Sequence, residues 1–233
     1  MEKLSPEVFF LYSSSISVYG DRLKKPFIKV GDPLRPSEGD EYARTKIKAE
    51  KIIIASKLDW SIFRLAVVMG GHKISKLMFH QPLKTSFEIV TPEDTARVFV
   101  NAINKMELLS GKIFNLGGWE KCRISYENFL SRSFKIYGLG ELDFPSKTFA
   151  KKNFHCGFYE DENELNDILG FRRDTIDSYF EKESNKVSSF KKSATKLLNK
   201  PIKYHLLKQS EPYKAYTQND KVQSKHFFVN LES

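Results

Sequence analysis

The chain has 233 residues, of which 40% are hydrophobic and 13% aromatic. This is enough to bury the core of one full domain, and it excludes a wholly disordered chain. The longest apolar runs, such as Ile62–Met69, fall far short of the ~18–20 residues that cross a bilayer. We therefore expect no transmembrane helix. Because the N-terminus also lacks the basic-then-apolar layout of a signal peptide, we expect a cytoplasmic protein.

The net charge of +9 is unevenly spread. Residues 181–233 contribute +6 from 11 Lys and 5 acids, whereas residues 1–180 contribute only +3. A nucleic-acid-binding core would carry its charge along one face of the fold. The distribution argues against a specific nucleic-acid partner and assigns the basicity mostly to a C-terminal tail.

Cysteine and histidine usage indicates neither disulfides nor a metal. The two cysteines, Cys122 and Cys156, cannot form a disulfide framework and lack CxxC spacing, so we expect two reduced structural thiols. The five histidines show no HxxxH or HxH spacing, and no metal site is expected.

In chain order, the first predicted element is a buried strand over Glu7–Tyr12 that ends in three serines. A Gly- and Pro-rich loop, 20–39, follows. A helix is then predicted from about Pro36–Asp40 to about Lys57, with Ser37 as a candidate cap. Further elements alternate along the chain: a strand over Trp60–Met69 closed by Gly70-Gly71, an extended piece at Phe87–Val90, a helix over Glu93–Met106 behind Pro92, a strand at Lys112–Leu116, and helices over Ser125–Tyr137 and Asp161–Leu169.

Strands that alternate with helices predict an α/β fold with a parallel sheet. Composition divides the chain into a core over 1–118, a small region over 119–183 and a basic tail over 184–233. Three interpretations of the tail stay open. It is a solvated or loosely docked extension, or its segment 188–207 lies as a basic amphipathic stretch on an anionic membrane surface. The third is a nonspecific contact with nucleic acid or another polyanion.

The sharpest candidate site combines Ser15, Tyr42 and Lys46. Tyr42 and Lys46 are four apart on one predicted helix and therefore share a face. A phenol is a poor base at neutral pH, but a nearby ammonium favours the phenolate, which suits proton exchange at a hydroxyl or carbonyl. Ser15 follows a buried strand, where α/β sheets place ligands, and its hydroxyl would hold the same oxygen. Arg64 inside a strand is either a contact to a ligand phosphate or half of a structural ion pair.

The sequence resembles the extended short-chain dehydrogenase/reductases, the NAD-dependent epimerase/dehydratase group, over about residues 1–183. The specific part of the resemblance is the serine strand end followed by Tyr42-Ala-Arg-Thr-Lys46. The segments that carry the resemblance, besides Tyr42–Lys46, are Ser13–Asp21 (SSSISVYGD), Lys48-Ala49-Glu50, Ile62-Phe63-Arg64, Glu88–Ala96, Ile113–Gly118 and Glu164–Phe171.

The resemblance implies a Rossmann-like, doubly wound parallel sheet with a small C-terminal substrate region. It implies that Ser15, Tyr42 and Lys46 are catalytic and that Tyr42 and Lys46 also contact the cofactor, NAD or NADP. Ser13 would lie beside that cofactor, and Leu65, Ala66 and Val67 would border its nicotinamide. The substrate would be a nucleotide sugar or, because the stretch between Gly70 and Val90 is short, a smaller carbonyl or alcohol.

The sequence departs from the family in one large respect. The family binds its cofactor through a Gly-rich turn after the first strand, but no two glycines here are three apart. We therefore expect a C-terminal portion that lacks the Gly-rich half, either a fragment or a chain that needs a partner strand or a second copy along its sheet edge. The alternative function is a non-catalytic relic or interaction module.

Overall fold

The computed structural model describes residues 8–70 and 74–228, which form two compact units. Of these described residues, unit 1 comprises 8–70, 87–123 and 155–175, and unit 2 comprises the others. Each unit is thus assembled from three separate stretches of chain, whereas the sequence analysis divided the chain consecutively at residues 118 and 183.

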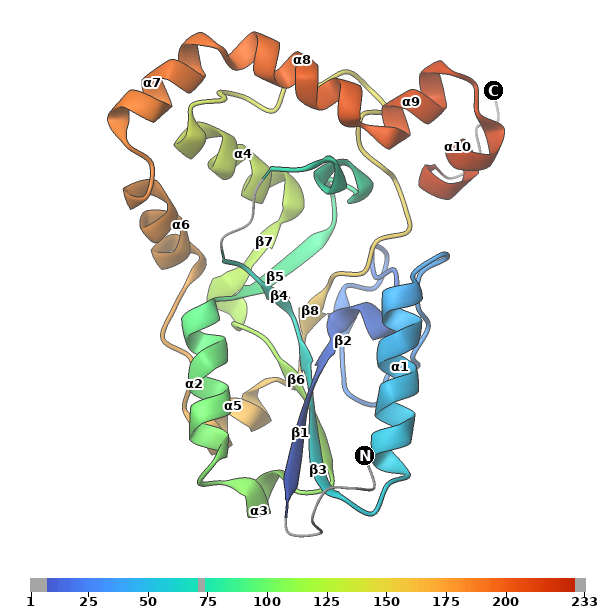
Figure 1. Ribbon diagram of the computed structural model, residues 1–233, viewed down its shortest axis with the longest axis vertical. Helices are drawn as coiled ribbons and strands as arrows, with labels where there is room; N and C mark the ends of the chain where they lie inside the picture. The colour runs from blue at the N-terminus through green and yellow to red at the C-terminus, as the bar shows by residue number, and fades with distance from the viewer. Residues whose placement is uncertain (1–7, 71–73, 229–233) are drawn as a thin grey trace. The chain divides into compact units, whose positions relative to one another are not determined.

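A three-stranded parallel sheet forms the centre of unit 1 (Figure 1). Its strands are β1 (Phe9–Ser15), β3 (Asp59–Leu65) and β6 (Lys112–Leu116), in the order β1-β3-β6. The register places Ser15 opposite Leu65 and Leu65 opposite Leu116, so the three carboxyl ends meet at one edge. All three strands were predicted from the sequence. The predicted start of the first strand, Glu7, lies outside the described residues.

Helices cover both faces of this sheet, as a doubly wound fold requires (Figure 1). Helix α1 (Glu41–Ile54) packs on one face against β1 and β3. Helices α2 (Pro92–Ala102), α3 (Met106–Leu109) and α5 (Asn163–Leu169) contribute to the core on the other face. The predicted α/β class and doubly wound arrangement are confirmed.

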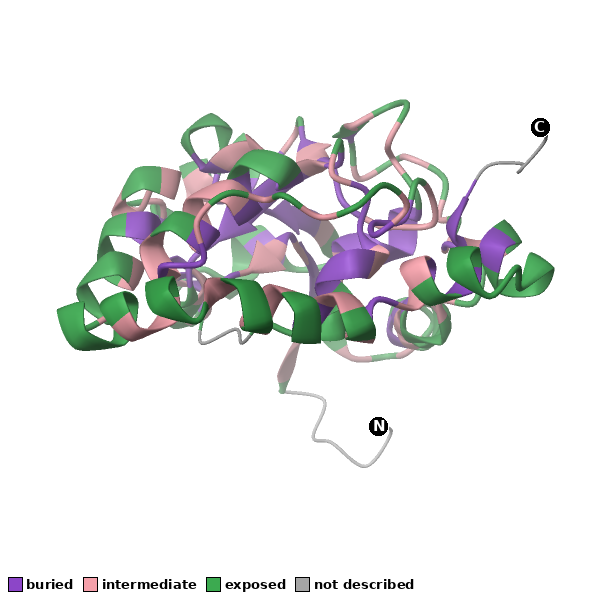
Figure 2. Cartoon of the chain, turned by 90° about the horizontal axis from the view of Figure 1, so that it is seen from above, coloured by how far each residue is buried: buried purple, intermediate pink, exposed green. Residues whose placement is uncertain are grey.

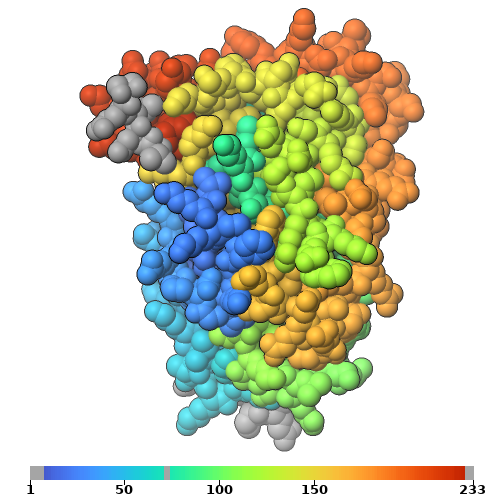
Figure 3. Space-filling model, turned by 180° about the vertical axis from the view of Figure 1, so that it is seen from behind, coloured from blue at the N-terminus to red at the C-terminus, as the bar shows by residue number. Residues whose placement is uncertain are grey.

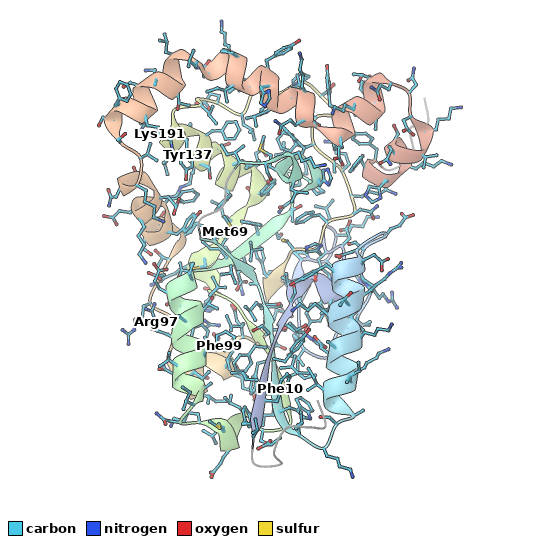
Figure 4. The ribbon with its side chains drawn as sticks, in the orientation of Figure 1. Phe10, Met69, Arg97, Phe99, Tyr137 and Lys191 are labelled. Atoms are coloured by element: carbon cyan, nitrogen blue, oxygen red, sulfur yellow. The ribbon has the colours of Figure 1, made fainter. Side chains whose placement is uncertain are left out.

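Side-chain alternation along β3 explains why each face is packed differently. Phe63 joins the main core, where Phe99 of α2 packs 5.9 Å from it between ring centroids (Figure 4). Arg64, one residue on, faces α1 instead and pairs with Glu50. The core on the α2 side contains Phe63, Val90, Val98, Ala102, Leu109, Phe114, Leu116, Leu165, Leu169 and Phe171.

Two short parallel pairs complete the strands of unit 1. Strand β4 (Val67–Val68) pairs with β5 (Ser86–Val90), and β2 (Phe27–Ile28) pairs with β8 (Phe158–Tyr159). In Figure 3 the segment around β2 lies against the segment around β8. The sequence analysis missed the second pair because two-residue strands carry no readable periodicity.

Helix ends follow capping chemistry, with one correction. Asp40, not the predicted Ser37, caps α1, and its side chain accepts a hydrogen bond from the Ala43 N–H. Ser37 lies three residues too early for that geometry, although its residue type is suitable. The glycine ending α5, Gly170, adopts the left-handed conformation with φ 57°, which confirms the predicted stop.

Unit 2 is mainly helical around an aromatic core. Phe79 is fully buried, and its ring lies 5.5 Å from that of Phe144 and 5.2 Å from that of Phe149. The short segment η3 (Glu120–Cys122) precedes its second stretch, and β7 (Arg123–Ser125) spans the start of that stretch at residue 124. The helices are η2 (Lys76–His80), α4 (Tyr126–Tyr137), α6 (Ile176–Asn185), α7 (Ser189–Leu197), α8 (Asn199–Gln209), α9 (Glu211–Thr217) and α10 (Lys221–Phe227).

Helices α7–α10 occupy most of the stretch that the sequence suggested to be a basic tail. Hydroxyl and carboxylate caps start three of them, from Ser188, Ser210 and Asp220. Each of these helices has only 7 to 11 residues, which is too short for a periodic pattern to identify it from the sequence. Buried residues gather along the strands and exposed ones along the helices (Figure 2). Within 8–70 and 74–228, no helix has both the length and the apolar character that crossing a bilayer needs.

Candidate functional site

The carboxyl end of β1 carries the three serines. Ser15 ends the strand and caps the short helix η1 (Ile16–Tyr19), because its hydroxyl accepts a hydrogen bond from the Ser17 N–H at 3.2 Å. Ser13 presents its backbone carbonyl toward α1. Ligands bind at this edge in open α/β sheets, so both serines stand where the sequence analysis expected a site.

Helix α1 brings Lys46 onto this strand end. The Lys46 Nζ donates to the Ser13 carbonyl at 2.7 Å and lies 5.5 Å from the ring centroid of Tyr42, one helical turn earlier. It lies 4.9 Å from the ring of Tyr12, and burial followed by the charge of Glu50 raises the pKa of Tyr12. Tyr42 is 56% exposed, so its phenol is open to a ligand. The structure therefore joins Lys46 to Tyr42 and Ser13.

The three residues expected beside the nicotinamide lie at the same edge of the sheet. Leu65 is the last residue of β3 and stands opposite Ser15 in the register. Ala66 is buried, and its N–H donates to the Leu116 carbonyl at 2.8 Å. Val67 begins β4. The backbone here is therefore held by sheet hydrogen bonds within one residue of the serine strand end.

A buried ion pair lies beneath this edge, and it settles the role of Arg64. The Arg64 guanidinium donates to both carboxylate oxygens of Glu50, at 3.1 and 2.7 Å, and Ser14 donates its hydroxyl to the same carboxylate. Both charged side chains are at most 4% exposed. Burial lowers the pKa of Arg64, but its hydrogen bonds to Glu50 and Tyr19, together with the charges of these two groups, outweigh burial, and the net shift is upward. Arg64 is thus a structural ion-pair partner.

The same network continues away from Ser14 across the sheet. Arg64 also donates to the Tyr19 hydroxyl at 2.7 Å, and Tyr19 donates to the Asn115 side chain at 2.8 Å. Asn115 donates in turn to Asp161 at 2.8 Å. Burial raises the pKa of Tyr19 to about 12, so this phenol stays protonated and acts as a donor. The chain of hydrogen bonds fixes the strand that carries the serines.

A second buried cluster, Glu88 with Glu162, Arg123 and Arg172, was not recognised from the sequence. Arg123 bridges the two acids, donating to Glu88 at 3.1 Å and to Glu162 at 3.2 Å. Arg172 lies 3.4 Å from the other oxygen of Glu162. Gly117 makes room for them, since a Cβ there would lie 2.0 Å from Glu88 Oε1 and 2.2 Å from Glu162 Oε2.

One carboxyl group of this cluster, that of Glu162, favours its protonated form. Burial and the hydrogen bond with Glu88 raise the pKa of Glu162 well above its usual range, against the lowering influence of Arg172 and Arg123. The negative charge of the neighbouring Glu88 disfavours the ionised form of Glu162, as burial does. Glu162 Oε2 has no hydrogen-bond partner, and the protonated carboxyl can use this oxygen as a donor.

Both cysteines are free and buried, as expected from the sequence. Burial raises the pKa of the Cys122 thiol to about 12, which keeps it protonated and unreactive at neutral pH. Burial likewise raises the pKa of Cys156. Neither thiol is a nucleophile candidate.

A partial signal for the buried networks was present in the sequence. Arg64 and Glu88 each interrupt a short apolar strand, which marks a charge that must find a partner inside the fold. Their partners, Glu50 and Glu162, lie on helix-forming or loop stretches that look solvent-facing. Pairings over 14 and 74 positions along the chain cannot be inferred from a single sequence.

Comparison with solved structures reveals similarity to short-chain dehydrogenase/reductases. A dTDP-glucose 4,6-dehydratase from Bacillus anthracis, in complex with NAD, is 14% identical with a TM-score of 0.63, over 77% of this chain and 61% of that one. A UDP-glucuronic acid 4-epimerase from Bacillus cereus, in complex with UDP-glucuronic acid and NAD, is 19% identical with a TM-score of 0.59, over 77% and 62%. A short-chain dehydrogenase/reductase superfamily protein from Agrobacterium tumefaciens, with bound NAD, is 16% identical with a TM-score of 0.54, over 83% and 69%.

These likenesses establish the fold, and they confirm at that level the resemblance inferred from the sequence. The chain spans about three fifths of the length of the dehydratase and the epimerase. No protein-family model matches the sequence. No curated protein sequence matches it either.

Proposed function

We propose that this chain carries the proton-exchanging and substrate-side part of an NAD(P)-dependent oxidoreductase of the epimerase/dehydratase type. The observation that supports it most is the position of Lys46. Its ammonium lies between the Tyr42 ring and the Ser13 carbonyl, at the carboxyl end of a parallel strand. A structural lysine on an exposed helix face would have no need of this contact.

In this proposal Tyr42 donates or accepts a proton at a substrate hydroxyl or carbonyl. Lys46 favours the charged phenolate through its positive charge and contacts the nicotinamide ribose. The Ser15 hydroxyl holds the reacting oxygen. The nicotinamide, when bound, supplies or takes up a hydride at the carbon that bears this oxygen. The exposure of Tyr42 suits such a role, because the phenol must meet a ligand from outside.

The residues at the carboxyl edge of the sheet fit the nicotinamide end of the cofactor better than its pyrophosphate. In this proposal the nicotinamide riboside contacts Ser13, Lys46 and the Leu65–Val67 backbone, which lie at the carboxyl edge of the sheet. The sequence contains no Gly-rich turn for the pyrophosphate. The proposed activity therefore depends on a phosphate cradle from additional polypeptide, and the choice between NAD and NADP depends on that polypeptide too. A nucleotide sugar is the proposed substrate class, since two structural neighbours are complexes of enzymes acting on such sugars.

The first experiment titrates the purified chain with NADH and NADPH. Trp60 and Trp119 report binding through quenching and energy transfer to the nicotinamide. We expect Lys46→Met to weaken saturable binding at least about tenfold, a loss of about 1.4 kcal/mol. Lys48→Met on the same helix is the matched control because Lys48 is exposed, and it should bind like the parent chain. Equal affinity of the two variants would overturn the proposed cofactor contact.

The second arm tests the proton transfer. Tyr42→Phe removes only the hydroxyl, so cofactor binding should persist while turnover of UDP- or dTDP-sugars falls by at least about 100-fold. Unchanged turnover would exclude Tyr42 as the acid/base. If the chain alone binds no cofactor, the same variants are compared after adding the Gly-rich half of a structural neighbour as a separate polypeptide.

A second candidate function is a non-catalytic interaction module, favoured by the edge of the sheet. Among the described residues, β1 pairs with β3 alone, and its Phe9–Tyr12 side chains are only half-buried. An open, apolar edge is a template for a parallel strand of another polypeptide or of a second copy. Sedimentation velocity with hydrophobic-dye binding tests it. A monodisperse monomer that binds no dye would contradict this function.

A further inference from the structure

Helices α7 and α8 carry a one-sided charge that the proposed chemistry does not use. Residues 184–210 contain seven lysines and no aspartate or glutamate. Two of these lysines have acidic partners within unit 2, since Lys186 pairs with Glu183 and Lys203 with Asp143. The lysines of this stretch are Lys186, Lys191, Lys192, Lys196, Lys200, Lys203 and Lys208.

The same helices expose large apolar side chains. Phe190 is 86% exposed, Leu197 84% and Tyr204 60%, and α7 buries none of its residues. Phe190 and Leu197 are seven positions apart on α7, which is nearly two helical turns, so they share one face of that helix. Leu198, at the junction between the two helices, is 53% exposed. We call these three residues, together with Tyr204 on α8, the apolar stripe.

The stripe faces away from the rest of unit 2. The opposite side of α7 packs on α4. There the backbone of Lys192 approaches Gly138 so closely that a Cβ on Gly138 would lie 2.5 Å from the Lys192 carbonyl oxygen. At about 100° per residue, Lys191 and Lys196 flank Phe190 on its two sides. Figure 4 labels Lys191 on α7. The outer surface of α7 and α8 is therefore an apolar stripe bordered by ammonium groups.

We propose that this α7–α8 surface docks on an anionic phospholipid bilayer. The phenyl and leucyl side chains enter the boundary between headgroups and acyl chains, and the flanking lysines contact lipid phosphates and carboxylates. A nucleic acid would use the lysines but leave the aliphatic residues in water. An uncharged partner helix would cover the stripe but gain nothing from the flanking lysines. The combination of both features favours the anionic membrane.

The test is co-sedimentation of the full chain with vesicles of neutral phosphatidylcholine and with vesicles holding about 30% phosphatidylserine. We expect binding to the anionic vesicles at least about tenfold tighter, weakening as salt rises. Phe190→Ser combined with Leu197→Ser should lower the affinity at least about tenfold. Val222→Ser on α10, where Val222 is 78% exposed, is the control and should bind like the parent.

A charge-matched pair isolates the role of position. Lys191→Glu/Lys196→Glu and Lys221→Glu/Lys225→Glu change the net charge by the same amount, and all four residues are exposed. Only the first pair should abolish vesicle binding. Equal loss in both would reduce the effect to overall charge and overturn the proposal. Far-UV circular dichroism of each variant checks that the helices remain formed.

A spectroscopic arm distinguishes insertion from surface attraction. The fluorescence of the tryptophan introduced by Phe190→Trp should be quenched by brominated acyl chains in anionic vesicles, whereas that of the tryptophan introduced by Val222→Trp should not. Quenching of neither would overturn the proposal. So would tight binding to a single-stranded oligonucleotide that is unaffected by Phe190→Ser/Leu197→Ser, since this result would indicate a polyanion contact instead of a membrane.

Discussion

The two units of the molecule handle charge in opposite ways. Of the residues that the structure describes, the five that are both charged and buried all belong to unit 1. Unit 2 buries only neutral polar side chains and surrounds its aromatic core with exposed lysines. The buried charges of unit 1 are Glu50, Arg64, Glu88, Asp94 and Glu162, and the buried polar residues of unit 2 are Gln81, Thr85, Thr148, Ser210 and Ser224.

This difference means that the two units are stabilised by different interactions. In unit 1 each buried charge is stable only while its partner is in place, so the strand ends that carry Ser13 and Ser15 depend on pairs such as Glu50–Arg64. In unit 2 the core relies on packing of aromatic rings, such as Phe79 against Phe149, and its surface charges are replaceable. Charge substitutions should therefore be costly in one unit and cheap in the other.

The largest effect is expected for Arg64→Met. It leaves the Glu50 carboxylate buried without its cation, which costs about 3–5 kcal/mol. Urea unfolding followed by tryptophan fluorescence measures it selectively, since Trp60 and Trp119 both lie in unit 1. Arg44→Met is the control, because Arg44 forms an exposed pair with Glu41 and should cost less than about 1 kcal/mol.

A double variant shows whether the cost comes from the stranded charge. Arg64→Met with Glu50→Leu removes both charges and should be less destabilised than the sum of the two single variants by at least about 1 kcal/mol. Additive losses would mean that the pair contributes only packing, and the contrast between the units would then rest on side-chain volume and not on charge.

An intermediate effect is expected in the pH dependence of unit 1. Because the pKa of Glu162 is raised in the folded state, the folded chain binds more protons than the unfolded chain above the ordinary glutamate pKa of about 4.3. The contribution of Glu162 to the free energy of unfolding is therefore full below that pH. It declines as the pH rises toward the folded-state pKa, by up to about 1.4 kcal/mol per pH unit. Glu162→Gln keeps the neutral shape and should flatten this decline.

The control for that measurement is Glu164→Gln on α5, where the side chain is exposed. Urea midpoints at pH 6, 7, 8 and 9 give the slope for each chain. An identical slope for Glu162→Gln and the parent would mean that the pKa of Glu162 is not raised in the folded state. The cluster would then be held by Arg123 and Arg172 alone.

Most of unit 1 could be predicted from the sequence because its strands are short apolar runs with polar ends. The runs ending at Tyr12 and beginning at Trp60 correspond to β1 and β3, and the turn chemistry of Gly170 ended α5 as expected. The exact cap of α1 was wrong because Ser37 and Asp40 are both good capping residues, and only the path of the chain selects Asp40.

Part of the candidate site could be predicted from the spacing of Tyr42 and Lys46 along the sequence. Tyr42 and Lys46 share a helix face whatever the rest of the fold does. That Lys46 reaches the Ser13 carbonyl depends on α1 packing against β1, 33 positions earlier in the chain, and only the structure shows it. The helices of residues 189–227 were not predicted because each has only 7 to 11 residues and buries few of them, so a periodic pattern is too short to identify one.

The smallest effect is expected for Lys191→Glu/Lys196→Glu in unit 2. Neither lysine is buried, and the two changes oppose each other at the helix termini, since a glutamate is favourable near the start of α7 and unfavourable near its end. The free energy of unfolding, followed by far-UV circular dichroism, should stay within about 0.5 kcal/mol of the parent. A loss of 2 kcal/mol or more would mean that the lysines stabilise α7 on α4. The charge of unit 2 would then be structural, as it is in unit 1, and the vesicle experiment would need the neutral Lys→Gln pair in its place.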